Sequence, residues 1–119
     1  TPKGKESAKA ILQAINSKLS MILLIDQKDS SGNNVTLFNL NAKTQIGFLK
    51  IARKYNLKLI PIQILREKIN NFSIIFHSPV DIFKQNISDI EAMTKIHKII
   101  EKWIISNPTQ WFWQHNRFN

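Results

Sequence analysis

The sequence predicts an α/β fold in which a layered, mostly parallel sheet is flanked by helices. Helical and strand-like periodicities follow one another in the order helix, strand, helix, strand, strand, helix, helix. Residues 21–25 form a short, continuous apolar run, which is typical of a strand buried on both faces of a parallel sheet. The chain has 119 residues, of which 43% are hydrophobic, so it can build a core but has length for one domain at most.

The first segment predicts a helix that leads into the apolar strand. Residues from Glu6 to Lys18 place their apolar side chains at helical spacing. The run from Met21 to Ile25 follows and ends at Asp26. Ligands gather at the carboxyl ends of strands in open α/β sheets, so Asp26 is a candidate site residue. The alternative is that Asp26 caps a turn or a helix.

The next segment is polar and then becomes helical. Residues 26–41 are predicted to be irregular, with a turn cluster at 30–34 and room for a short strand over 35–40. Thr44 can cap a helix that runs from Gln45 to about Tyr55. Apolar residues occupy most sides of that helix, so it is expected to be well buried: Ile46, Phe48, Leu49, Ile51 and Ala52.

A hairpin is predicted in the centre of the chain. Residues 57–65 read as a strand, and Pro61 removes one backbone donor, so this strand lies at an edge or is broken there. Asn70 and Asn71 mark a turn, and residues 72–76 return as the partner strand.

A long helix is predicted near the end of the chain. Ser88, followed by Glu91, forms a capping-box pattern, and the helix extends to about Ser106. His97 lies on the apolar stripe of this helix, where a core histidine with one hydrogen-bonded nitrogen is expected. Glu101 lies four residues after His97, which indicates a surface pair on one helix face.

The chain ends in a short helix and an aromatic tail. Asn107 is predicted to cap this helix, Pro108 suits its first position and Gln110 can close a capping box. Trp111 and Trp113 then either pack on the sheet or lie at a membrane interface, where amphipathic aromatic residues are favoured. Packing is the preferred interpretation, because a short helix directs these two side chains to different faces.

The sequence contains no complete catalytic pair. A His-x4-Asp/Glu pair lets a carboxylate orient an imidazole as a general base. His77 and His97 are followed at that spacing by Ile82 and Lys102, and the chain ends before the corresponding position for His115. There is no cysteine, no glycine-rich phosphate loop and no cluster with metal-ligand spacing. We therefore expect no metal and no cofactor.

The charge of the chain favours anionic partners. Its 17 Lys+Arg against 8 Asp+Glu give a net charge of +9. Phospholipid headgroups, phosphorylated glycolipids, nucleic acids and acidic carrier proteins all fit, and a generally solvated basic surface fits equally. No nucleic-acid motif is present, so no nucleic-acid partner is expected. No apolar run of about 18 residues is present either, so no transmembrane helix is predicted.

Three blocks of the sequence are more specific. The first has an Asp-Gln pair at a strand end, then a loop and a helix rich in small residues. The second is an apolar strand with a proline and a downstream arginine. The third is a Gln-Trp-x-Trp-x-His ending. The first block contains Leu24 to Gln27, Gly32, Val35, Phe38, Ala42 to Thr44, Gly47, Ile51 and Ala52. The second block contains Leu59 to Ile62 and Arg66. The third block contains residues 100–104, Pro108, Gln110 to Trp113, His115, Arg117 and Phe118.

In these blocks the chain resembles the lipid A acyltransferases, also called lauroyl or myristoyl acyltransferases of lipopolysaccharide assembly. The resemblance covers essentially the whole chain and implies that residues 1–119 are the C-terminal portion of a single acyltransferase domain. The departures are Asn39 and Asn41, where glycine and proline are usual, and Thr109 and Asn116 near the end.

The resemblance implies transfer of a fatty acyl chain from acyl carrier protein to a lipid A precursor at a membrane surface. It implies that Asp26 and Gln27 line the substrate cleft, that Thr44 caps the helix beside it, and that Arg66 meets a phosphate group. These four are the substrate-binding candidates. An alternative for Arg66 is a surface pair with Glu67 or Asp81, which would leave it without a role in binding.

The family's catalytic His-x4-Asp/Glu pair lies upstream of the matched segment, so the resemblance implies no catalytic base in this chain. The chain alone is therefore expected to be inactive, and the protein to act at the cytoplasmic face of the bacterial inner membrane. The alternative function is a free-standing basic module that binds anionic membrane lipid or, with less support, nucleic acid.

Overall fold

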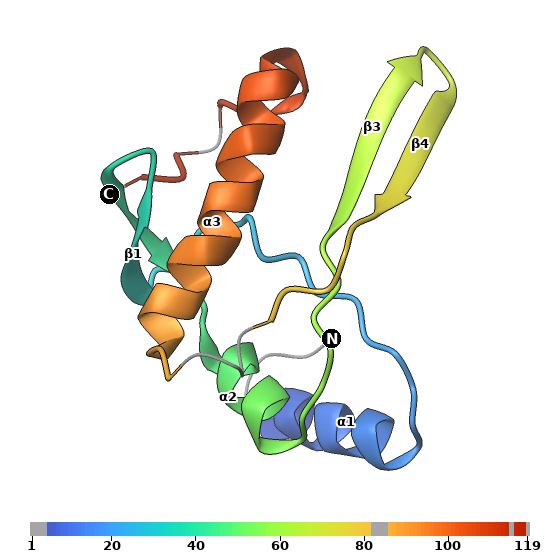
Figure 1. Cartoon of the computed structure of the whole chain (residues 1–119), viewed down its shortest axis with the longest axis vertical. Helices are drawn as coiled ribbons and strands as arrows, with labels where there is room; N and C mark the ends of the chain where they lie inside the picture. The colour runs from blue at the N-terminus through green and yellow to red at the C-terminus, as the bar shows by residue number, and fades with distance from the viewer. Residues whose placement is uncertain (1–4, 82–85, 115, 119) are drawn as a thin grey trace.

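A computed structural model describes residues 5–81, 86–114 and 116–118 and has a mixed α/β fold (Figure 1). Helix α3 lies beside one hairpin, a second hairpin projects away from it, and the other two helices lie below. The elements are α1 (Lys5–Asn16), β1 (Asn33–Leu37), β2 (Leu40–Thr44), α2 (Gly47–Lys54), β3 (Ile62–Lys68), β4 (Asn71–Phe76), α3 (Asp89–Ser106) and the short 3-10 helix η1 (Pro108–Gln110).

Helix α3 begins at the predicted capping box. The backbone N–H of Glu91 donates to Ser88 Oγ over 3.2 Å, and the backbone N–H of Ser88 donates to Glu91 Oε2 over 2.7 Å. These bonds satisfy two of the N–H groups that a helix leaves unpaired at its start. Because the required residues are only three positions apart, this part of the fold was predictable from sequence.

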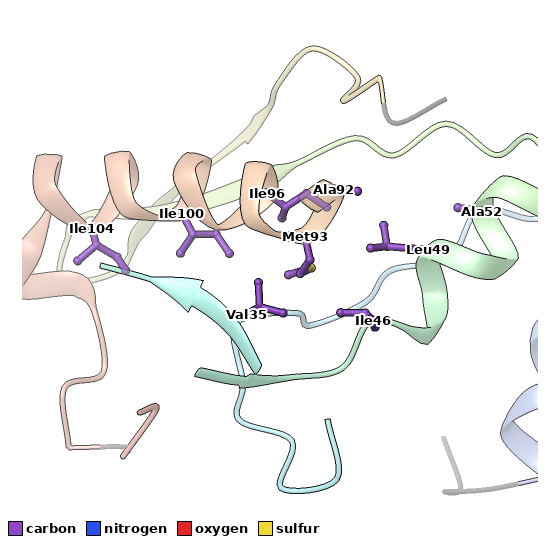
Figure 2. Packing of buried hydrophobic residues seen from close by; sticks show 9 residues of the cluster. All are labelled: Val35, Ile46, Leu49, Ala52, Ala92, Met93, Ile96, Ile100 and Ile104. Atoms are coloured by element: carbon purple, nitrogen blue, oxygen red, sulfur yellow. The ribbon is translucent and has the colours of Figure 1, made fainter. Parts of the chain in front are cut away.

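The core lies where α3 packs on β1 and α2. Figure 2 shows the side chains of Met93 and Val35 between these elements, with Ile46 and Leu49 beside them. The buried cluster consists of Val35, Ile46, Leu49, Ala52, Ala92, Met93, Ile96, Ile100 and Ile104. The α3 members recur at three- and four-residue spacing, so one face of the helix fills the core.

Strands β1 and β2 form an antiparallel hairpin joined by a two-residue turn. Phe38 and Asn39 in this turn have φ values of 49° and 60°, the left-handed pair that a tight hairpin turn requires. Asparagine tolerates that conformation better than most residues other than glycine, so Asn39 suits its place in this turn. Strand β2 was not predicted, since residues 26–41 were expected to be irregular apart from a short strand.

Strands β3 and β4 form the predicted second hairpin. They pair antiparallel, with Gln63 opposite Ile75 and Leu65 opposite Ser73. Strand β3 begins directly after Pro61 rather than at residue 57, in agreement with the break expected at that proline. Before it, Leu59 makes only an isolated bridge to Val80.

The expected parallel sheet does not form among the described residues. The α/β class is correct, but the strands pair in two separate antiparallel sheets of two strands each. The apolar run over residues 21–25 has no strand assignment, and the side chains of Ile22 and Leu24 are 81% and 76% exposed. A strand needs a partner edge for its backbone groups, and no described strand supplies one here.

Helix α2 begins differently from the prediction. Its first residue is Gly47, its cap position is Ile46, and no side chain caps it in the expected way. The prediction that Thr44 caps this helix is therefore wrong, because Thr44 closes strand β2 and its side chain is fully buried. Gly32 directly precedes strand β1 and lies close to the backbone of Thr44 in strand β2. A Cβ atom at position 32 would collide with that backbone.

Candidate functional site: an apolar groove and a buried arginine cluster

An apolar groove opens between the extended segment 21–26, strand β3 and helix α3. Its volume is about 530 Å³. Asp26 is the single charged residue among the described residues that line it. Its walls include Ile22 and Leu24 from the extended segment, Ile62 and Ile64 from β3, and Ile99 and Trp103 from α3. A groove with this lining suits an apolar occupant.

Asp26 is the last residue of the extended segment and Gln27 follows it, and both are exposed. Asp26 is among the residues that line the groove, and its predicted role in binding substrate stays a prediction. It also acts on the buried guanidinium of Arg117. Burial lowers the pKa of Arg117, and the attraction of the Asp26 carboxylate opposes that effect.

Arg117 is the centre of a buried polar cluster. Its side chain is 2% exposed, although it lies two residues from the end of the chain. Nη1 donates to the backbone carbonyl of Lys43 over 2.9 Å, and Nη2 donates to Thr44 Oγ1 over 2.7 Å. Thr44 in turn donates to the carbonyl of Ala42 over 3.0 Å. Thr44 therefore holds the C-terminal segment against β2, in place of its predicted role at the helix.

His97 completes the cluster from helix α3. Its Nδ1 lies 2.8 Å from the carbonyl oxygen of Thr36 in strand β1. A carbonyl only accepts, so Nδ1 carries the proton and Nε2 presents its lone pair to Arg117 Nη2, 3.5 Å away. The side chain is 1% exposed. The prediction of a core histidine with one bonded nitrogen is confirmed.

The protonation state of His97 couples the cluster to pH. Burial lowers the pKa of His97 from 6.5, while the Thr36 carbonyl raises it, Arg117 lowers it and Glu101 raises it. The folded chain thus keeps this imidazole neutral at a pH where the unfolded chain begins to protonate it.

We predict that the free energy of unfolding falls as the pH drops below about 6.5, by at most about 1.4 kcal/mol per pH unit from this group. The unfolded state binds the proton first, so the stability is full above that pH and is lost as the pH falls toward the folded pKa. Urea unfolding between pH 8 and pH 5 measures the slope. A His97→Gln variant should show a shallower slope, and equal slopes in both proteins would contradict the assignment.

Glu101 is buried, contrary to the predicted surface pair with His97. Its carboxylate is held by the backbone N–H of Phe38 over 2.7 Å and by Lys98 Nζ over 2.8 Å. Burial acts to raise the pKa of Glu101, but the bonds from Lys98 and Phe38 outweigh it and lower the pKa. Helix α3 therefore holds the turn of the β1–β2 hairpin through a charged group.

Arg66 lies on strand β3 with its side chain exposed. Its guanidinium lies over the ring of Phe72, with 5.1 Å between the guanidinium carbon and the ring centroid. The Gln110 side chain forms hydrogen bonds with both backbone groups of Arg66. Its amide oxygen accepts from the Arg66 N–H over 2.8 Å, and its amide nitrogen donates to the Arg66 carbonyl over 3.1 Å. Gln110 therefore does not close a capping box, and the Arg66 guanidinium remains available at the surface.

The aromatic tail is packed at one residue and exposed at the next two. Trp111 packs against the core and lines the groove. Phe112 and Trp113 are exposed, and the Trp113 ring N–H donates to the carbonyl of Pro108 over 2.7 Å. The preferred interpretation, packing, is correct for Trp111 only. His115 lies outside the described residues.

The structure does not bring the four candidate residues together at one site, and Gln27 follows Asp26 as an exposed residue. Asp26 lies at the groove, Arg66 lies on the projecting hairpin, and Thr44 is enclosed with Arg117. Arg117 is part of the C-terminal block that resembles the acyltransferases, but the sequence predicts no structural role for it. Its burial depends on contacts with residues more than 70 positions away. Within the described ranges, no three His, Asp or Glu side chains gather as a metal site.

None of the helices in the described part of the chain is long and apolar enough to cross a bilayer. A family model described as "Bacterial lipid A biosynthesis acyltransferase" matches residues 2–119. A comparison with individual curated proteins gave no match. Because the family model matches nearly the whole chain, the chain belongs to the bacterial lipid A biosynthesis acyltransferase family.

Proposed function

We propose that this chain supplies the C-terminal portion of an enzyme that transfers a fatty acyl chain from acyl carrier protein to a hydroxyl group of a lipid A precursor. The family match over residues 2–119 carries the proposal. The enzyme would act at the cytoplasmic face of the bacterial inner membrane, where its glycolipid acceptor presents a phosphorylated headgroup.

The catalytic base would come from a polypeptide portion that carries the family's His-x4-Asp/Glu pair. No histidine in this sequence has an acid at that spacing. His97, the best placed by packing, already uses Nδ1 on the Thr36 carbonyl and directs Nε2 toward Arg117 inside the protein. It therefore cannot reach a substrate hydroxyl as a general base, which must lie within hydrogen-bond distance of the proton it removes.

The chemistry requires few groups from this portion. The base removes the proton of the acceptor hydroxyl, whose oxygen forms a bond to the thioester carbonyl carbon. The carbon–sulfur bond then breaks, and the carrier leaves as a thiol after it takes up a proton. This chain would contribute positioning, through Asp26 at the groove, through Gln27 next to it in the sequence and through Arg66 on the hairpin.

Arg66 is the best candidate for a phosphate contact, because its guanidinium is exposed and its backbone is fixed on both groups by Gln110. A planar guanidinium can bind two phosphate oxygens at once. Stacking on Phe72 restricts its motion further. Ordering before binding reduces the entropy that the contact would otherwise cost.

The proposal is tested by measuring acyl transfer from acyl carrier protein to a lipid A precursor. The 119-residue chain alone should give no turnover, and the same chain joined to a His-x4-Asp/Glu portion of the family should give turnover. Turnover by the chain alone would refute the proposal that the catalytic base lies outside this chain. A joined protein without turnover would refute the proposed acyl transfer.

In the joined protein, Arg66→Gln is expected to raise the KM for the phosphorylated acceptor about tenfold, the effect of losing about 1.4 kcal/mol of binding. Lys68→Gln is the matched control, because it removes an exposed cation from the same strand. Steady-state kinetics with each variant measure KM and kcat separately. An equal KM change in both variants would indicate general charge attraction and not a specific phosphate contact.

A further inference from the structure

We propose that Arg117 and Phe118 are positioning residues for substrate binding, because they hold the loop that carries Asp26 at the groove. Together these two residues form a C-terminal clasp. The inference rests on the proposed function, in which Asp26 helps to position the acceptor. Arg117 is 2% exposed, so it acts on a substrate only through the residues around it.

The loop that follows the extended segment is joined to the clasp at two points. Lys28 Nζ donates to the Phe118 carbonyl over 2.9 Å, across 90 positions of sequence. The second point is the Lys43 carbonyl in strand β2, which accepts from the Asp29 backbone N–H over 3.1 Å and from Arg117 Nη1 over 2.9 Å. The loop and the guanidinium therefore share one backbone acceptor, so the positions of Asp29 and Arg117 depend on each other.

Asp26 is fixed mainly by its neighbours in sequence. Residues 20–28 belong to no helix or strand, so no ladder of backbone hydrogen bonds holds them in place. Ile25 packs against the core. Asp26 is thus held between one apolar contact before it and the contacts of Lys28 and Asp29 after it. The clasp therefore helps to set where the Asp26 carboxylate lies.

The guanidinium also acts on Asp26 by charge. Burial lowers the pKa of Arg117, and the attraction of the Asp26 carboxylate opposes that effect. The attraction is mutual, so the buried cation draws the carboxylate toward it. Solvent weakens this attraction, because Asp26 is exposed. Arg117 Nε is buried without a hydrogen-bond partner among the described residues, so a nearby negative charge is the compensation that this side of the guanidinium receives.

A buried cation is a costly way to anchor a chain end. Buried ionic groups can often be replaced by apolar residues of similar volume without loss of stability, so anchoring alone could use apolar contacts. A cation does what an apolar side chain cannot, since it favours one orientation of a nearby carboxylate. A carboxylate at a groove accepts hydrogen bonds from hydroxyl groups, and an ordered one binds them at a smaller entropic cost. The charge of Arg117 is therefore linked to acceptor binding.

The test uses the complete chain joined to a His-x4-Asp/Glu portion of the family, with KM and kcat measured for the acceptor. Arg117→Met removes the charge and is expected to raise this KM about tenfold, the effect of weakening one hydrogen bond to a charged group. Arg117→Lys keeps a cation behind Asp26 and should stay within about threefold of the unmodified KM. An equal rise in both variants, or no rise in Arg117→Met, would overturn the positioning role.

Glu101→Ala is the matched control for stability. Glu101 is buried and holds the turn of the first hairpin, so its loss destabilises the fold and leaves the clasp in place. Its acceptor KM should stay within about twofold of the unmodified value. When Asp26 is already asparagine, Arg117→Met should raise KM by less than about twofold further, because its target carboxylate is gone. Independent effects of the two changes, or a rise in Glu101→Ala equal to that in Arg117→Met, would overturn the proposal.

Hydrogen exchange in the 119-residue chain gives a readout that needs no activity. The Asp29 amide donates to the Lys43 carbonyl, and the Gly32 amide donates to the Asp29 carbonyl over 2.8 Å. Arg117→Met should speed exchange at both amides at least tenfold through local opening of the loop, and Glu101→Ala should leave both unchanged. Unchanged exchange in Arg117→Met would refute the clasp alone. A joined protein without turnover would refute the proposed function, and the exchange rates would still decide whether the clasp holds the loop.

Discussion

Replacing Arg117 with alanine is expected to lower the free energy of unfolding by about 3 kcal/mol. The guanidinium donates to the Lys43 carbonyl and to Thr44 Oγ1 at a site where the side chain is 2% exposed. Charge-assisted bonds of this kind are each worth about 1.5–3 kcal/mol, and relief of the buried charge offsets part of that loss. Alanine also leaves a cavity beside His97, which adds to the cost.

Two further substitutions separate these contributions. Arg117→Met restores most of the apolar volume, so the part of the loss that it fails to recover belongs to the hydrogen bonds. Arg117→Lys keeps the charge but cannot reproduce the two-pronged contact to Lys43 and Thr44, so it should remain well below the unmodified chain in stability. Urea unfolding at pH 7.5 measures all three. An alanine variant within about 0.5 kcal/mol of the unmodified chain would contradict the structural role.

Local signals in the sequence predicted the elements that depend on neighbouring residues. The Ser88–Glu91 capping box and the start of β3 after Pro61 both appear where expected. Each depends on side-chain or backbone chemistry within a few positions. The turn that connects β3 and β4 lies at Ile69 and Asn70, one residue earlier than the predicted turn at Asn70 and Asn71.

The features that were missed depend on partners distant in sequence. The run at 21–25 has the composition of a buried strand, but composition cannot supply the neighbouring strand that would bury it. Thr44 reads as a helix cap from sequence, because threonine suits that position. Its actual partner, Arg117, lies 73 positions away. Of the four site candidates, Asp26 lines the groove, and the substrate contacts of Asp26, Gln27 and Arg66 stay predictions.

The charged contact between α3 and the first hairpin gives the second large effect. Glu101→Ala is expected to cost about 2–3 kcal/mol, because it leaves the Phe38 N–H without its acceptor in a partly buried turn. Phe38 is also in the left-handed region at φ 49°, which a residue with a side chain adopts at a cost of about 1–2 kcal/mol. The carboxylate helps to hold this conformation.

Glu101→Gln keeps an acceptor for the Phe38 N–H and removes only the negative charge, so it should lose about 1 kcal/mol or less. Lys98→Ala should have a smaller effect still, since that ammonium is about half exposed and exposed ion pairs contribute about 0–1 kcal/mol. Urea unfolding ranks the three variants. If the alanine variant lost no more stability than Lys98→Ala, the turn would not depend on the carboxylate, and Phe38 would keep its backbone conformation through apolar packing against the core alone.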